Sequence, residues 1–258
     1  MTANVLAELG IRATCSFVQA WGKHMRRFLI RAFFASLIIG AVCLVFRQGL
    51  LPAHLTPLPR LDLKHPLPLV VDWQLAELRF DRRLCRETIT QSGLIRARQI
   101  PDKVRSNGCG WTNAVRMSEA GGASIGVNRV SCQVAAAVAL WVQYVVQPAA
   151  KRIFGKRVVG VTNYGTYSCR NIVGNSFWQD RRSEHASANA IDISSFRLEG
   201  GDTISVLKHW RAKGKKAEFL RAVHNGACSY FRVALSPNFN AAHKDHFHFD
   251  RGILWTCK

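Results

Sequence analysis

An uncharged apolar run near the N-terminus constrains this chain more than any other feature. Residues 32–46 (AFFASLIIGAVCLVF) carry no charge, and the run extends back through Phe28-Leu-Ile with only Arg31 interrupting it. A helix needs about 20 such residues to cross a bilayer, and an arginine near its end can reach the membrane surface. We therefore predict a transmembrane signal-anchor over residues 28–50.

The flanks of this run predict its orientation. Four cations precede it, at Lys23, Arg26, Arg27 and Arg31. The positive-inside tendency places residues 1–27 in the cytoplasm and everything after Arg47 outside. For a bacterial protein this means a single pass through the cytoplasmic membrane, with the C-terminal domain in the periplasm. A cleaved signal peptide is the alternative, although no clear small-x-small cleavage site follows the run. Met25 is an alternative start.

Two further segments follow the anchor. Five of the eight prolines lie between Pro52 and Pro68, which predicts an extended, semi-rigid linker over residues 51–70. Residues 71–258 are enough for one globular domain. The pattern of helical segments first and interleaved strands later predicts the α+β class.

Several elements can be placed within that domain. Residues 132–144 (CQVAAAVALWVQY) are apolar nearly all round, as in a buried helix, with Ser131 as its cap. Pro148 either ends this helix or begins the next turn. Residues 158–162, 190–193 and 247–250 read as strands, residues 203–210 as strand or helix, and residues 215–223 as a helix.

Cysteine usage agrees with export. Six of the eight cysteines follow the apolar run, at Cys85, Cys109, Cys132, Cys169, Cys228 and Cys257. An even number beyond an export signal predicts three disulfides, whose pairing the spacing does not give. Buried thiols or metal ligands are the alternatives. The lack of a Cys-x-x-Cys pair argues against a zinc–thiolate site.

The charge balance is strongly basic, with 36 Lys and Arg against 16 Asp and Glu. A basic surface suggests an anionic partner: nucleic acid, acidic lipid or an acidic wall polymer. The chain contains no nucleic-acid motif and its basic residues are scattered, so we do not expect nucleic acid as the partner.

Two short polar motifs carry metal-ligand chemistry. One runs from Ser183 through His185 to Asp192, and the other is HKDHFHFD at residues 243–250. On a strand, His246 and His248 would share one face while the phenylalanines beside them are buried. If the strand that carries Asp192 lies alongside, His248 and Asp192 meet, and His185 can fold back as a third ligand. Three protein ligands with an open fourth position are typical of catalytic Zn²⁺; the alternative is a set of ordinary hydrogen-bonded histidines.

These motifs resemble a known group of enzymes. Ser183-x-His185-x6-Asp192 followed by His246-x-His248 is similar to the LAS metallopeptidases, which include lysostaphin-type endopeptidases, D-alanyl-D-alanine peptidases and hedgehog domains. The chain looks in particular like the extensin-like protein C-terminal domain, from about Cys85 to Cys257. The other motifs that carry the resemblance are Tyr167-Ser-Cys169-Arg170, Ala190-Ile-Asp192-Ile, Phe196 and Asp245-His-Phe-His248-Phe-Asp250. It implies a single LAS/hedgehog-type zinc peptidase domain with a central antiparallel sheet.

The resemblance also implies roles for individual residues. His185, Asp192 and His248 would bind zinc, and His246 would act on the zinc-bound water or the oxyanion. His243 joins the catalytic set because penicillin-insensitive murein endopeptidases of this group carry His-x-x-His-x-His. Asp245 stands where the dipeptidase branch has a general-base glutamate, but it could act only from a turn. We prefer His246 as the base, with Asp245 as the second choice or as an orienting group.

Three further positions follow from the same resemblance. Arg170 matches an arginine beside the scissile carbonyl, where a guanidinium stabilises negative charge; the alternative is a surface cation. Ser183 would contact substrate or support His185, or be a simple turn residue. Ala188 stands where dipeptidase relatives have glycine, so the turn before Asp192 is a place where this chain could differ.

The sequence thus predicts a membrane-anchored zinc peptidase that hydrolyses peptide bonds of peptidoglycan stem peptides or cross-links. A non-catalytic, zinc-containing wall-binding module and a plain structural domain are the alternatives. The presence of both His243 and His246 favours the enzyme.

Overall fold

The computed structural model describes residues 25–45, 59–174 and 177–258 of the chain, which forms two compact units, Met1–Phe46 and Arg47–Lys258. In the first unit, the helix Met25–Val45 is long and apolar enough to cross a membrane, and its side chains are exposed. It has the character of a transmembrane span or of a signal sequence. Cys43 lies on this helix as an exposed free thiol, whereas Cys15 and Lys23 fall outside the described residues.

The second unit begins earlier than predicted. Residues 51–58 of the expected linker lie outside the described residues, but residues 59–70 pack against the domain. Leu61 and Leu63 are only 6% and 1% exposed and belong to the hydrophobic core. The Tyr144 hydroxyl donates a hydrogen bond to the Leu63 carbonyl at 3.1 Å. Because these leucines complete the core, the folded part starts well before residue 71.

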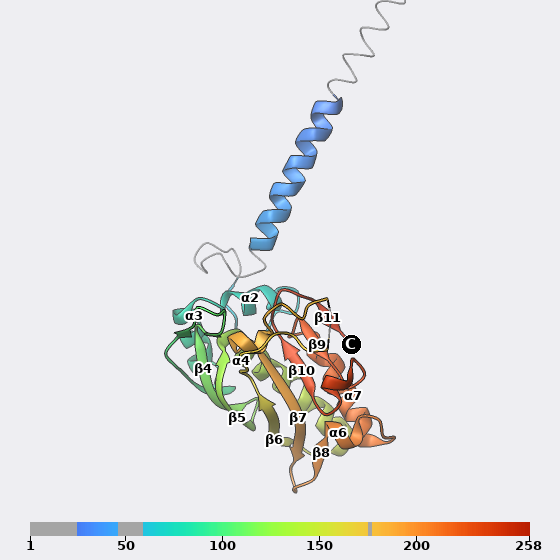
Figure 1. The fold of residues 1–258 in the computed structure, drawn as a ribbon. Helices are drawn as coiled ribbons and strands as arrows, with labels where there is room; N and C mark the ends of the chain where they lie inside the picture. The colour runs from blue at the N-terminus through green and yellow to red at the C-terminus, as the bar shows by residue number, and fades with distance from the viewer. Residues whose placement is uncertain (1–24, 46–58, 175–176) are drawn as a thin grey trace, which may run out of the picture. The chain divides into compact units, whose positions relative to one another are not determined.

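The domain is built on one nine-stranded sheet (Figure 1). Its strands follow the order β1-β4-β5-β6-β7-β10-β9-β11, and β8 pairs with β7. All pairs are antiparallel except β5–β6 and β9–β11, so the fold is α+β with a mostly antiparallel sheet. The strands are β1 (Ile95–Gln99), β4 (Ala114–Ala120), β5 (Ala123–Ser131), β6 (Val158–Gly165), β7 (Ala190–Leu198), β8 (Thr203–Ser205), β9 (Val233–Leu235), β10 (Phe247–Asp250) and β11 (Thr256–Cys257). A separate pair, β2 (Lys103–Val104) and β3 (Gly110–Trp111), lies outside it.

Helices form the second layer. They are α2 (Val71–Glu77), α3 (Arg82–Gln91), α4 (Cys132–Trp141), α5 (Gln147–Phe154), α6 (Val206–His209) and α7 (Lys215–Ala227). Every residue of α4 is buried, which explains its apolar character all round and its resemblance to a membrane span. The side chains that β1, β4 and β5 direct toward it join the same core, so the opposite face of these strands is left to polar residues.

The long core helix continues further than predicted. A π-helical turn, Val142–Val146, joins α4 to α5, so the predicted end at residue 144 is too early. Pro148 lies in the first turn of α5, directly after the π-helical turn, which accommodates its missing N–H. Ser131 does not cap α4 with its side chain, because its hydroxyl donates to Asn189 Oδ1 at 2.8 Å.

All six domain cysteines pair, as predicted. The disulfides join Cys85 to Cys132, Cys109 to Cys169 and Cys228 to Cys257. The first ties α3 to the start of α4. The second fastens the loop that carries Arg170, and the third fastens the C-terminus to the end of α7.

Candidate metal centre

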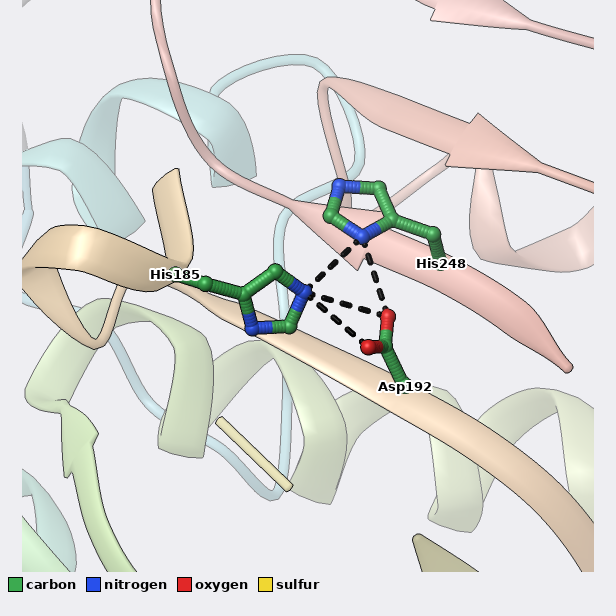
Figure 2. Close-up of side chains that lie close together, drawn as sticks. All are labelled: His185, Asp192 and His248. Atoms are coloured by element: carbon green, nitrogen blue, oxygen red, sulfur yellow. Dashed lines mark hydrogen bonds and ion pairs between the residues drawn. The ribbon is translucent and has the colours of Figure 1, made fainter. Parts of the chain in front are cut away.

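The register of β7 and β10 brings two candidate ligands side by side (Figure 2). In this antiparallel pair, His248 lies directly opposite Asp192. The residues on either side of them are fully buried and pack into the core: Ile191, Ile193, Phe247 and Phe249. Because successive side chains of a strand alternate in direction, this burial directs Asp192 and His248 to the other face.

An aromatic cluster holds β10 in place. The Phe249 ring lies 5.2 Å from that of Trp141 on α4 and 4.9 Å from that of Phe231. A slip of one residue would turn these rings out of the apolar core and put the polar side chains of His248 and Asp250 in their place. The register that places His248 is therefore set by core packing.

A short turn before β7 presents His185. The 3₁₀ turn Glu184–Ser187 begins at Ser183, whose hydroxyl accepts a hydrogen bond from the His185 backbone N–H at 3.3 Å. The Ser168 N–H donates to the His185 carbonyl at 3.1 Å. Ala188 closes the turn with φ +54°, the left-handed conformation that favours glycine. The turn therefore has a left-handed residue at this position even though the residue is alanine and not glycine.

Asn189 fastens the same turn to the core helix. Its side-chain oxygen accepts hydrogen bonds from the Ser131 hydroxyl at 2.8 Å and from Gln133 Nε2 at 2.7 Å, both at the start of α4. Its amide donates to Glu184 at 2.7 Å. Burial, and then the charge of Asp250, raise the pKa of the Glu184 carboxyl. The turn carrying His185 is therefore tied to the most buried element of the domain.

The three candidate ligand atoms form a nearly equilateral triangle. Asp192 Oδ1 lies 3.1 Å from His185 Nε2 and 3.0 Å from His248 Nδ1, and the two ring nitrogens are 3.2 Å apart. Zinc bonds of about 2.0–2.1 Å in a tetrahedron set neighbouring ligand atoms about 3.3 Å apart. Two imidazole nitrogens and one carboxylate are also a donor set that suits Zn²⁺. The residues present therefore fit a zinc ion with one side left open.

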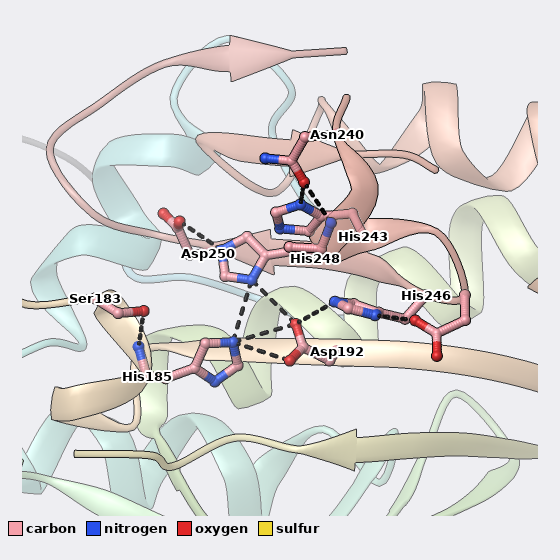
Figure 3. Close-up of polar contacts among 10 residues, drawn as sticks. Ser183, His185, Asp192, Asn240, His243, His246, His248 and Asp250 are labelled. Atoms are coloured by element: carbon pink, nitrogen blue, oxygen red, sulfur yellow. Dashed lines mark hydrogen bonds and ion pairs between the residues drawn. The ribbon is translucent and has the colours of Figure 1, made fainter. Parts of the chain in front are cut away.

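Asp250 determines which nitrogen His248 offers. His248 Nε2 donates to Asp250 Oδ2 at 3.0 Å, which leaves Nδ1 directed at Asp192 and His185 (Figure 3). Burial lowers the pKa of His248, but hydrogen bonds with Asp192 and Asp250 outweigh this and raise it to about 9. Burial alone would raise the pKa of the Asp192 carboxyl, but its hydrogen bonds with His185 and His248 hold this pKa well below the usual range. Asp250 was not among the predicted site residues, although its i+2 spacing from His248 puts both side chains on one face of the strand.

His246 reaches the triangle from just outside β10. The strand begins at Phe247, so the prediction that His246 and His248 share one strand is wrong at this residue. Even so, His246 Nε2 lies 3.5 Å from Asp192 Oδ1 (Figure 3). Its Nδ1 lies 2.9 Å from Asp245 Oδ1. Asp245 lies in a turn, which is the only placement from which it could act. It contacts His246 rather than the triangle.

His243 completes the group of histidines. Its ring lies 5.3 Å from that of His246 and 5.6 Å from that of His248. Burial, and then the neighbouring His248 and His246, lower the pKa of His243 to about 4. Its Nδ1 lies 2.6 Å from the side-chain oxygen of Asn240, which the sequence analysis did not identify. This neutral imidazole therefore has its orientation fixed by Asn240.

A cleft of about 390 Å³ opens beside these residues. Ser183, His243, His248 and Arg170 line it together with apolar side chains that include Trp178, Leu235 and Phe239. The Arg170 loop is held by the Cys109–Cys169 disulfide and by a 3.1 Å bond from the Ser183 N–H to the Arg170 carbonyl. The structure thus brings all the sequence-predicted site residues to one region.

Comparison with known proteins adds one finding. The sequence profile of the family described as extensin-like protein C-terminus matches residues 83–258. This covers the six cysteines and every candidate site residue. No curated protein and no solved structure matches the chain.

Proposed function

The chain belongs to the extensin-like protein C-terminus family, and we propose that its domain is a zinc-dependent peptidase that hydrolyses peptide bonds of peptidoglycan stem peptides or cross-links. One observation carries this proposal: two imidazole nitrogens and a carboxylate oxygen lie 3.0–3.2 Å apart beside an open cleft, with two further histidines within reach. The motifs also resemble those of the LAS metallopeptidases.

The residues divide into holding and reacting groups. His185, Asp192 and His248 would hold the ion. A zinc ion with three protein ligands acts as a Lewis acid and lowers the pKa of a bound water to about 7. His246 Nε2 faces the three candidate ligand atoms and is placed to accept a proton, while Asp245 contacts the other ring nitrogen of His246. Arg170, on the cleft wall, would stabilise negative charge on the scissile carbonyl oxygen.

The surroundings of the site favour an acidic substrate. Arg170, Arg181 and Arg182 line the cleft. The two acidic side chains that line the cleft are engaged within the domain: Asp250 with His248 and the Gly252 N–H, and Glu184 with Asn189. Wall peptides carry free carboxylates, so their charge complements this cleft. Three disulfides fit an oxidising compartment such as the periplasm, and the helix Met25–Val45 would anchor the domain at the cytoplasmic membrane.

A zinc-containing module that binds wall peptides without cutting them is the alternative function. It would use the same ligands, so the triangle alone does not distinguish the two. The His246–Asp245 pair favours the enzyme, because a pure binding site needs no oriented base beside the metal ligands.

The test uses the full chain in detergent with zinc measured by emission spectroscopy. We expect one zinc per chain, lost in His185→Ala and His248→Ala. His246→Ala should keep zinc but release new peptide termini from cross-linked muropeptides about 10²–10⁴ times more slowly. His65→Ala, at an exposed histidine away from the site, is the control and should change neither quantity.

Three outcomes would contradict parts of this proposal. Zinc that stays near one per chain in both ligand variants would remove His185 and His248 from the site. Wild-type turnover in His246→Ala would transfer the base to Asp245 or His243. A zinc-loaded wild type that cuts no wall peptide would favour the binding module.

A further inference from the structure

Three arginines form a row on the polar face of the sheet. Arg98 on β1 lies directly opposite Arg116 on β4. On β5, the register places Arg129 close to Arg116, because Val115 pairs with Val130 and Met117 with Val127. Arg98 and Arg116 are exposed and Arg129 is half-buried. Like charges directly opposite each other on neighbouring strands destabilise a sheet, so this row opposes folding.

The row is not neutralised by the protein. Among the described residues, no carboxylate forms an ion pair with any of the three arginines. The nearby acids are engaged elsewhere: Asp102 pairs with Arg82 at 2.6 Å and Glu119 with Arg96 at 3.5 Å. The positive charge of the row is therefore available to an external anion.

The row lines a groove of about 650 Å³, with Lys103 and Trp111 on its wall. Arg129 lies 5.1 Å from the Trp111 ring and 5.6 Å from the Tyr167 ring, and Lys103 lies 5.8 Å from Trp111. Trp111 is itself fixed, since its indole N–H donates to the Pro101 carbonyl at 3.0 Å. Contacts with ring faces hold cations in position at little cost. Arg129 and Lys103 are thus held in position on the Trp111 side of the groove, next to the two exposed arginines of the row.

The strand registers connect this groove with the candidate metal centre. β5 pairs with β6 in parallel at Ser124 and Gly160, so Asn128 comes level with Tyr164 further along. Side-chain bonds from Asn163 to the Gly126 carbonyl and from Thr166 to the Arg129 carbonyl agree with this alignment. On the next pair Gly165 lies opposite Asp192.

The arginine row and the metal ligands therefore lie at one level across the sheet. From β1 to β10 the path crosses five strand spacings of about 4.8 Å, or about 24 Å. An extended peptide of about seven residues covers this distance. Tyr164, whose ring lies 5.7 Å from that of His246, stands between the two ends.

We propose that the groove is a second binding site for the peptide that enters the metal cleft, in which Arg98, Arg116 and Arg129 bind its carboxylate groups. Guanidinium forks bind carboxylates in a bidentate manner. Peptide carboxylates are favoured over phosphates because the arginine row lies at the level of the candidate metal ligands, within the reach of one extended peptide. That the ligand is a peptide rests on the proposed function. That the groove binds anions does not.

The test measures binding of fluorescently labelled hexaglutamate to the full chain in uncharged detergent. Hexaglutamine and inorganic polyphosphate of matched charge serve as competitors. The groove variant is Arg98→Gln/Arg116→Gln. The matched control is Lys208→Gln/Arg211→Gln, which removes the same charge at exposed positions outside the groove.

We expect hexaglutamate to bind the groove variant about tenfold more weakly and the control less than twofold more weakly. Hexaglutamine should compete poorly, and salt should weaken binding. The melting temperature of the groove variant should stay the same or rise, because the repulsion within the row is reduced. A structural role for these arginines would lower it.

Other results would overturn the proposal. Equal losses in both variants would mean attraction by net charge alone. Stronger competition by polyphosphate than by hexaglutamate would assign the groove to phosphate. Muropeptide cleavage separates this proposal from the proposed function. If hexaglutamate binds through the groove but no muropeptide is cleaved, only the peptidase proposal is wrong. If the groove variant cleaves muropeptides with an unchanged KM, only the second binding site is wrong.

Discussion

At the scale of single residues, the site depends on side chains that fix the ring nitrogens of its histidines. Asp250 accepts from His248 Nε2, Asp245 contacts His246 Nδ1, and Asn240 contacts His243 Nδ1. In His248 and His246 this leaves the other ring nitrogen directed at Asp192. The candidate ligands were recognisable from the sequence because their motif is local. Asn240 was not, because its role depends on turn geometry, whereas Asp250 was missed even though its i+2 spacing from His248 was a local signal.

Asp250→Asn tests this orientation directly. The oxygen of the new amide would keep the bond from the Gly252 N–H, so its NH2 group would face His248 Nε2. The ring would then have to carry its proton on Nδ1, the ligand atom. We expect zinc affinity to fall about 10–100-fold, measured by competition with a chromophoric chelator. Asp245→Asn is the matched control, since Asp245 contacts His246 rather than a ligand. A similar loss in both variants would show that the tautomer of His248 is not what matters.

At the scale of elements, local patterns predicted more than long-range pairings. The alternation around Asp192 and His248 identified both strands and their buried faces, because a strand has a strict period of two. The extent of the core helix was missed, since a π-helical turn accommodates Pro148. The order of strands was not predictable either, because β10 lies between β7 and β9 through pairings of residues far apart in the chain.

The Cys109–Cys169 disulfide gives a test at this scale. It closes a separation of 60 residues and holds the loop that leads into Arg170. The chain-entropy relation gives about 4 kcal/mol for a loop of that length. We expect Cys109→Ser/Cys169→Ser to lower the free energy of unfolding of the domain by about this amount in urea titrations.

Cys43→Ser serves as its control, because Cys43 is a free thiol on the N-terminal apolar helix. It should leave the urea midpoint unchanged. Unfolding of the double variant at the wild-type midpoint would mean that other contacts hold this loop.

At the scale of the whole molecule, one ion cluster joins distant parts of the folded unit. Asp72 on α2 bonds Arg232 at 3.0 Å through both of its oxygens and Arg251 at 2.8 Å. The two guanidiniums are almost completely buried, whereas the Asp72 side chain is 22% exposed. Burial lowers the pKa of Arg251 to about 10, so it stays charged at neutral pH. Asp72 therefore balances two buried cations and links the start of the domain to the segment after β10.

This cluster predicts how stability depends on pH. Burial alone would raise the pKa of Asp72, but its bonds to Arg232 and its attraction to Arg251 lower it below the usual value. A group with a depressed folded pKa contributes its full stability above its unfolded pKa, about 3.9, and loses it as pH falls through the folded value. At pH 7 we expect Asp72→Asn to lower the free energy of unfolding by about 3 kcal/mol, because two buried cations each lose one anionic partner. In urea titrations from pH 7 downward, the wild-type and Asp72→Asn curves should converge at acid pH. Asp180→Asn, at an exposed carboxylate, should follow the wild type throughout. Parallel curves for wild type and Asp72→Asn would show that this cluster does not stabilise the domain through its charge.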